Sequence, residues 1–207
     1  MSAPTTRRTA VVGIGNSLLT DDGAGIHALE RFAKNNFDER VFCLDGGTVG
    51  LALLDRLSNL DGLVVLDAMK LGAKPGTVVV LTGDDMDAHL RNQHGSVHEV
   101  GLSDLMDALR LRGDLPERRA LIGIEPQDMG WGTWPTTAVA AALPEACDPA
   151  RKMVQRWQME QPVGDFARTG KTKSRCRSTR RTATCGLSYS RSCTHSTGYS
   201  TKTRQPQ

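Results

Sequence analysis

The sequence lacks any long hydrophobic run. In 207 residues, no stretch approaches the roughly 18 consecutive apolar residues that span a bilayer. The first residues, MSAPTTRRTA, lead directly into VVGIG, without the apolar segment and small-residue cleavage site of a secretory signal. We therefore predict a cytoplasmic protein that works without a membrane.

Cysteine is scarce, and its five occurrences are at closest eight residues apart. This spacing excludes a CxxC zinc knuckle or redox pair, and an odd number excludes a complete disulfide framework. We predict free thiols in a reducing compartment. Cys43 falls in a predicted strand and Cys147 in a predicted helix, so both are expected to pack in the core rather than act as nucleophiles.

Several common catalytic motifs are absent: the P-loop GxxxxGK[ST], the GxSxG elbow and the HExxH zinc helix. Gly13-Ile14-Gly15 begins a dinucleotide fingerprint, but Leu18 stands where its third glycine belongs. Asp21 and Asp22 then place negative charge where a pyrophosphate needs a helix N-terminus. A dinucleotide-binding oxidoreductase is therefore only a weak alternative.

Charge divides the chain in two. Residues 161–207 carry ten Lys or Arg and one acid, a net charge of +9, whereas the first 160 residues carry a net −6. We predict one domain over residues 1–160, without the basic patch of a nucleic-acid binder. The Ser- and Thr-rich tail over 161–207 has too few apolar residues for a core and is expected to be disordered. It is either a native basic arm or a non-native extension, and its cysteines and His195 are not expected to be ligands.

The first 160 residues alternate short apolar runs with segments of helical periodicity. This alternation predicts an α/β fold of three layers, α/β/α, with a twisted, mostly parallel five-stranded sheet. The expected strands are Thr9–Ile14, Val41–Leu44, Gly62–Leu66, Thr77–Leu81 and Ala120–Ile124. The expected helices are Ala24–Phe37, Gly50–Leu57, Leu102–Leu111 with Ser103 as a candidate N-cap, Thr136–Leu143 and Pro149–Gln158, the last two separated by Pro144 and Pro149.

Ligands of such sheets bind at the carboxyl ends of the strands. Carboxylates follow the first three strands: Asp21 and Asp22, then Asp45, then Asp67. Each of them alone fits a turn or a helix cap. His89, His94 and His98 follow the fourth strand, and each alone fits a solvated surface histidine.

As a set, these residues are more informative. Carboxylates that converge on one crevice repel each other, which calls either for raised pKa values or for a bound cation. Oxygen donors joined by one imidazole nitrogen suit a divalent transition metal with open positions. Spacing does not decide which of the three histidines would take part.

Three segments together resemble the nickel–iron hydrogenase maturation endopeptidases. They are VVGIGNSLLTDDGAGIHALE, LDGGTVGLALLDRLSNLDGLVVLDAMKLGAKPGTVVVL and SVHEVGLSDLMDALRLRGDLPERRALIGIEPQ. The similarity extends over about residues 9–158 and has no counterpart for the tail. The resemblance implies a sheet between helices and an endopeptidase that removes a short C-terminal peptide from the nickel-loaded precursor of the hydrogenase large subunit.

The resemblance also implies a ligand set. The metal-contacting acid of the first loop, the Asp at the end of the third strand and the His of the later segment fall on Asp22, Asp67 and His98. Asp22 stands where many family members have Glu. Nickel would arrive with the substrate, so the free enzyme needs no metal of its own. We expect a monomer, with Asp45-Gly46-Gly47 as a structural turn and Asn16 fixing the first loop. The alternative is a nickel-sensing assembly factor that binds the precursor without cutting it.

Overall fold

The computed structural model describes residues 8–36, 38–48, 51–92 and 97–160, with residues 97–100 described by their backbone alone. The predicted tail, with Cys176, Cys185, Cys193 and His195, lies outside the described residues, as does His94. Within the described part, no helix is both long and apolar enough to cross a membrane.

A five-stranded sheet forms the middle layer, in the order β2-β1-β3-β5-β4. The strands are β1 (Thr9–Gly13), β2 (Val41–Asp45), β3 (Gly62–Ala68), β4 (Val78–Thr82) and β5 (Arg118–Ile124). β1, β2, β3 and β5 are parallel, whereas β4 pairs antiparallel with β5. The prediction of a mostly parallel five-stranded α/β sheet is thus confirmed, with the reversed strand at one edge.

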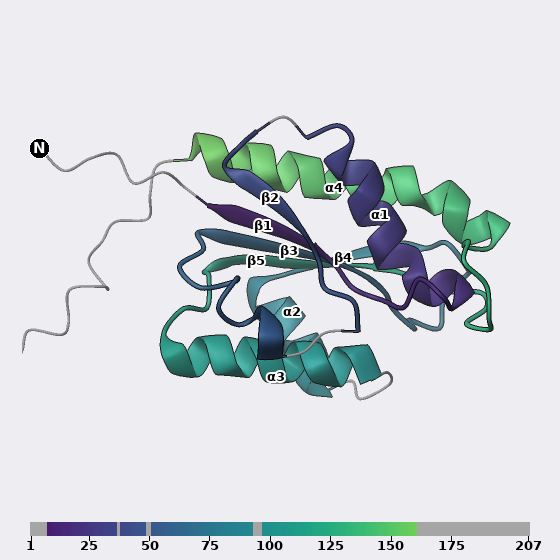
Figure 1. Cartoon of the computed structure of the whole chain (residues 1–207), viewed down its shortest axis with the longest axis horizontal. Coiled ribbons are helices and arrows are strands. Elements are labelled where there is room, and N and C mark those ends of the chain that lie inside the picture. The colour runs from purple at the N-terminus through teal and green to yellow at the C-terminus, as the bar shows by residue number, and fades with distance from the viewer. Residues whose placement is uncertain (1–7, 37, 49–50, 93–96, 161–207) are drawn as a thin grey trace, which may run out of the picture. The chain divides into compact units, whose positions relative to one another are not determined.

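Helices cover both faces of the sheet (Figure 1). α1 (Ala24–Ala33) and α4 (Thr137–Met159) lie on one face, and α2 (Gly83–Asn92) and α3 (Val97–Arg112) on the other. Alternate residues of β3 point to opposite faces, so Val64 and Leu66 join the core under α1 and α4, while Leu63 and Val65 join the core over α2 and α3.

Two of the predicted helices differ from the structure. The segment expected to be helical over Gly50–Leu57 contains only a 3₁₀ turn, η2 (Leu51–Leu53), among its described residues. Leu57 and the nearby Leu60 are buried, although this segment does not form an α-helix. Between them, Asn59 adopts a positive φ of 56° and turns the chain. α3 begins at Val97, so Ser103 lies inside the helix and is not its N-cap.

The predicted break between two closing helices is also wrong, because α4 is continuous from Thr137 to Met159. Each proline inside a helix removes one hydrogen bond and costs about 3 kcal/mol. Pro144 is exposed and Pro149 half-buried, which places both off the packed side of the helix. The helix persists because its other side is buried over its whole length, from Val139 to Trp157.

The sequence analysis missed α2, whose residues are mostly polar. The antiparallel β4 ends at Thr82, opposite Ala120 near the start of β5. The chain therefore leaves β4 at the amino end of the parallel strands. α2 follows there, and α3 then begins at the carboxyl end of these strands (Figure 1). The missed helix therefore helps to bring the His98 segment to the same end of the sheet as the other predicted site residues.

Candidate active site

Buried carboxylates gather at the carboxyl end of the parallel strands. Among the described residues, five Asp or Glu residues are less than a tenth exposed, and four of them belong to this end: Asp21, Asp22, Asp67 and Glu125. Ionised carboxylates are rarely buried unless they accept hydrogen bonds or meet positive charge. Asp21, Asp22 and Asp67 of the predicted set are therefore buried at this end of the sheet, whereas Asp45 is exposed.

Asp22 lies in the 3₁₀ turn η1 (Thr20–Gly23), between β1 and α1, and is 4% exposed. Its Oδ2 accepts a hydrogen bond of 3.0 Å from the amide of Asn16. The Oδ1 of Asn16 accepts a hydrogen bond from the amide of Leu18, as expected for a residue that fixes this loop. The Asn16 amide, which a dinucleotide phosphate would need as a donor, is thus already bonded to the Asp22 carboxylate. This contact argues against the dinucleotide alternative.

Asp67 is the sixth residue of β3, opposite Gly123 of β5, and is 2% exposed. By strand alternation it points to the side of α2 and α3, because Val65 and Met69 belong to the core on that side. η1 is in contact with β3, so the segments that carry Asp22 and Asp67 are neighbours.

Gly25 is one reason for this closeness. A Cβ at this position would lie 2.3 Å from the carbonyl oxygens of both Ile14 and Leu66. Only glycine therefore lets the start of α1 rest directly on the ends of β1 and β3.

His98 is the second residue of α3, and its side chain lies outside the described residues. The helix begins at the carboxyl end of the sheet, on the side toward which Asp67 points (Figure 1). Among the residues whose side chains are described, no group of three His, Cys, Asp or Glu residues is placed to hold a metal. Asp22 and Asp67 offer the hard oxygen donors of the predicted set, and the contribution of His98 stays a prediction.

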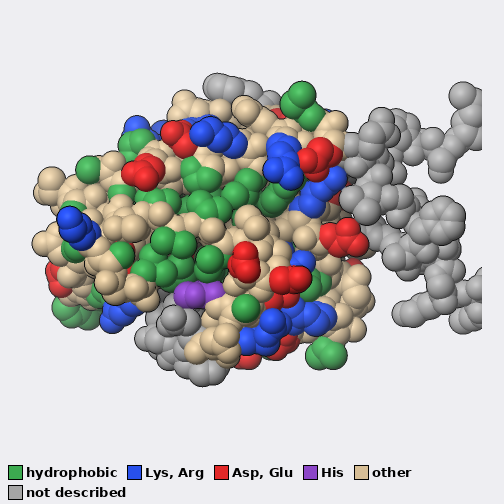
Figure 2. Space-filling model, turned by 180° about the vertical axis from the view of Figure 1, so that it is seen from behind, with side chains coloured by type: hydrophobic (Ala, Val, Ile, Leu, Met, Phe, Trp, Pro, Cys, Tyr) green, Lys and Arg blue, Asp and Glu red, His purple; other side chains and the backbone are tan. Residues whose placement is uncertain are grey.

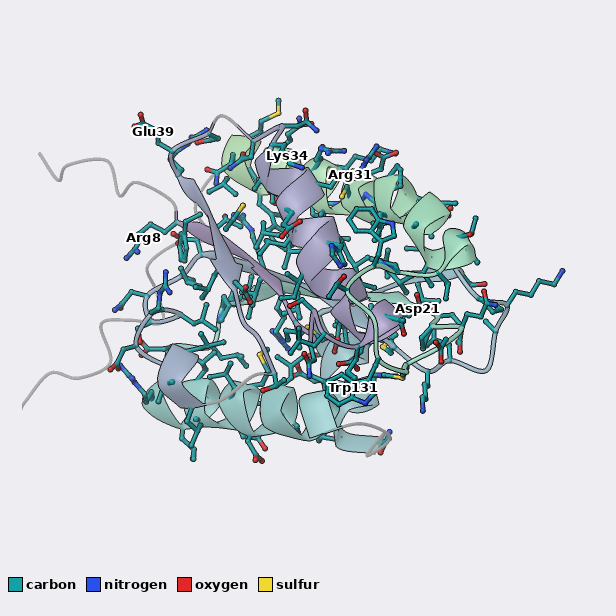
Figure 3. All side chains as sticks on the ribbon, turned by 45° about the vertical axis from the view of Figure 1, so that its right-hand side comes forward. Arg8, Asp21, Arg31, Lys34, Glu39 and Trp131 are labelled. Carbon is teal, nitrogen blue, oxygen red and sulfur yellow. The ribbon has the colours of Figure 1, made fainter. Side chains whose placement is uncertain are left out.

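Asp21 has a structural role that the sequence analysis did not foresee. It is fully buried, and its carboxylate accepts hydrogen bonds from the amides of Gln127, Asp128 and Thr136 and from the Thr136 hydroxyl, over 2.6–2.9 Å. One side chain thus fixes both ends of the loop between β5 and α4. Figure 3 shows Asp21 and Trp131, a residue of this loop, near each other at the end of the sheet.

Glu125 was missed by the sequence analysis, although it directly follows β5 as the other acids follow their strands. It is 7% exposed, and its Oε2 accepts hydrogen bonds from the amides of Leu71 (2.6 Å) and Ala73 (3.1 Å). Glu125 thereby ties the loop after β3 to β5. A cavity of about 400 Å³ lies between these loops and is lined by Lys70, Gly72, Glu125, Pro126, Gln127, Asp128 and Met129.

Asp45 and the histidines have other positions. Asp45 is exposed at the end of β2, and its Oδ1 accepts the amide of Gly47, which has a positive φ of 52°. The expected structural turn is therefore confirmed. The Gly47 carbonyl accepts the amide of Gly15, which joins this turn to the first loop. His89 lies in the last turn of α2, and His94 lies outside the described residues.

Both described cysteines are free and pack as predicted. Cys147 is fully buried in α4, and its thiol donates to the carbonyl of Ala28. Cys43 is half-buried in β2. Burial raises the pKa of both thiols, which disfavours the thiolate that a nucleophile needs.

Comparison with known proteins agrees with this arrangement. A sequence model described as hydrogenase maturation protease matches residues 26–152, which include Asp67 and His98 and begin after Asp22. The chain belongs to this family. It is therefore a protease, which also sets the dinucleotide alternative aside.

Individual maturation proteases extend the match. The hydrogenase expression/formation protein HupD of Rhizobium leguminosarum is 35% identical over 76% of this chain and 79% of its own length. The hydrogenase 2 maturation protease of Escherichia coli is 37% identical over 59% of this chain and 75% of its own length. The structure of the hydrogenase maturating endopeptidase HybD of E. coli superimposes with a TM-score of 0.68 at 32% identity, covering 72% of this chain and 93% of HybD.

Proposed function

We propose that this protein removes a short C-terminal peptide from the nickel-loaded precursor of a nickel–iron hydrogenase large subunit. The observation that carries the proposal is the pair of buried acids, Asp22 and Asp67, on neighbouring segments at the carboxyl end of the sheet. Membership in the maturation proteases supports the reaction type. The nickel dependence is our inference from the resemblance to the nickel–iron hydrogenase maturation endopeptidases, and the donor set suits a divalent transition metal.

The nickel is part of the substrate in this proposal. Asp22 and Asp67 each offer carboxylate oxygens, and His98 would add an imidazole nitrogen, so the set can occupy open positions on a divalent ion that the precursor presents. A metal held in this way polarises a carbonyl or activates a bound water. The chain's own residues orient the ion against the scissile bond, and a precursor without nickel would leave the site incomplete.

Other properties belong to the same proposal. Free thiols at Cys43 and Cys147 suit a reducing compartment, which supports a cytoplasmic location. We further infer a monomer that binds the precursor protein and neither nucleic acid nor membrane.

The test is a mass spectrum of a large-subunit precursor after incubation with the protein, with and without nickel loading. We expect loss of a C-terminal peptide from the nickel-loaded precursor only. Asp67→Ala and His98→Ala should each lower the rate by at least about a hundredfold, because the metal loses a ligand. Asp85→Ala is the matched control, because Asp85 is exposed on α2.

Two results would change the proposal. Full processing by Asp67→Ala or His98→Ala would refute the ligand assignment. Nickel-dependent complex formation without any change of mass would favour the assembly-factor alternative.

A further inference from the structure

Three large apolar side chains are exposed beside the candidate active site. Leu18 is 55% exposed, Trp131 85% and Trp134 67%. The third tryptophan of the chain, Trp157 of α4, is 8% exposed and packs in the core between this helix and the sheet. We call Leu18, Trp131 and Trp134 the tryptophan rim. An exposed tryptophan contributes little buried area to the stability of the fold, and a cluster of exposed apolar side chains is typical of an interaction site.

The rim is held firmly in place. Leu19 and Trp131 form an antiparallel β-bridge, and the amide of Gly132 donates to the Leu18 carbonyl over 3.0 Å. The Thr20 hydroxyl reaches the carbonyls of Asp128 (2.6 Å) and Gly130 (3.2 Å). Two loops more than a hundred residues apart are thus joined into one surface.

Two further contacts fix the ends of the loop that carries the tryptophans. Asp21 accepts amides from both ends, at Gln127 and Thr136. Trp134 rests on His27 of α1, with ring centroids 5.0 Å apart and the planes tilted by 59°. Rigid aromatic side chains lose little conformational entropy on binding, which is why tryptophan is enriched among residues that dominate protein interfaces.

The charge around the rim indicates what kind of partner it fits. Neither residues 16–20 nor residues 129–136 contain a Lys, Arg, Asp or Glu. A nucleic acid or an anionic membrane would require basic side chains here. An apolar patch on a protein requires none.

The rim is also continuous with the candidate active site. A single stretch, from Leu18 to Asp22, carries one rim residue, the Asp21 anchor and one predicted metal contact. Leu18 of the rim and the predicted metal contact are therefore carried by the same short loop, four residues apart.

We propose that the tryptophan rim binds an apolar surface patch of the hydrogenase large-subunit precursor and holds its C-terminal segment at the active site. This inference rests on the proposed function for the identity of the partner. The rim supplies binding energy away from the reacting bond, whereas Asp22, Asp67 and His98 act on the bond itself.

The test compares the processing kinetics of Trp131→Ala and Leu18→Ala with those of the wild type. Each should raise KM about tenfold and leave kcat nearly unchanged, because the lost contact lies outside the reacting groups. Leu111→Ala is the matched control, because Leu111 is 90% exposed at the far end of α3, and its KM should equal that of the wild type. Wild-type KM in both rim variants would overturn the inference and leave the proposed function intact.

A second measurement does not depend on activity. The protein is labelled with 5-fluorotryptophan, and its three ¹⁹F signals are assigned with Trp131→Phe and Trp134→Phe. Adding unlabelled precursor should shift or broaden the Trp131 and Trp134 signals and leave that of the buried Trp157 unchanged. Such a shift without loss of a peptide would support the rim and refute the proposed cleavage of this precursor. A shift that appears with rising protein concentration alone would mean that a second copy covers the rim, and would overturn the inference.

Discussion

Asp21 and Asp22 are adjacent identical residues with different environments. The carboxylate of Asp21 accepts hydrogen bonds from four donors in the loop between β5 and α4, whereas Asp22 accepts the amide of Asn16 in its own loop. The first acid therefore builds the scaffold, and the second is the one that we assign to the reaction. A structural acid and a candidate metal ligand are thus neighbours in the sequence.

Asp21→Ala should destabilise the fold by about 3 kcal/mol or more, because it leaves several buried donors without an acceptor. The measurement is urea unfolding, followed by circular dichroism. Asp21→Asn should be milder, since its amide oxygen still accepts some of these bonds. Asp128→Ala serves as a control, because its carboxylate is exposed and, within the described part of the chain, accepts an amide only from the nearby Gly130. Equal stability of Asp21→Ala and wild type would contradict the scaffold role.

At the scale of elements, an ion-pair cluster holds the polar helix α2 to its neighbours. Asp87 of α2 is 7% exposed and meets Arg119 of β5 at 2.9 Å and Arg110 of α3 at 2.7 Å. Burial alone would raise the pKa of Asp87, but the hydrogen bonds and charges of Arg119 and Arg110 outweigh it and lower that pKa. The same pairing raises the pKa of Arg119.

The lowered pKa of Asp87 predicts how the free energy of unfolding depends on pH. An unfolded Asp titrates near pH 4, and the folded Asp87 titrates below that value, so the cluster stabilises the fold above about pH 4. Its contribution is lost as the pH falls through the folded pKa. We expect Asp87→Asn to lower the free energy of unfolding by about 3 kcal/mol at pH 7, because it leaves Arg119, whose side chain is only 11% exposed, without its charged partner. The deficit should shrink below about pH 4.

The matched control for this prediction is Asp85→Asn, an exposed position on the same helix. Its stability should follow that of the wild type from pH 7 to pH 3. A deficit of Asp87→Asn that stays constant over this range would rule out the titration of Asp87 as its cause.

At the scale of the molecule, the antiparallel edge of the sheet is apolar and partly exposed. β4 is an edge strand with half-buried or exposed side chains, and Val80 is 38% exposed. In the view from behind, hydrophobic side chains also gather in the middle of the molecule, with charged ones around them (Figure 2). Such patches on a maturation protease are consistent with a protein that handles a protein substrate.

The tail makes a separate prediction at this scale. Its composition lacks the apolar residues needed for a core, so removing residues 161–207 should change the melting temperature by no more than about 2 °C. Differential scanning calorimetry of the full and shortened chains measures this change. Processing by the shortened chain should equal that of the full chain, and a large loss of stability would show that the tail packs against the domain.

Much of the fold could be predicted because its signals are local. Apolar, β-branched runs mark the five strands, and the start of α1 follows directly from the periodicity after Gly23. The boundaries were less accurate. α1 ends at Ala33, and Asn36 turns the chain toward β2 through a hydrogen bond from its Nδ2 to the Val41 carbonyl.

The sequence by itself determined the layer architecture, the family and the placement of acids at the carboxyl end of the sheet, because these follow from hydrophobic period and motif order. Tertiary structure decided the reversal of β4, the polar helix α2, the unbroken α4 and the separate roles of Asp21 and Asp22. Each of these depends on contacts between residues far apart in the chain. Burial against α1 and the sheet outweighs the two prolines of α4, and the amides that bind Asp21 come from a loop more than a hundred residues away.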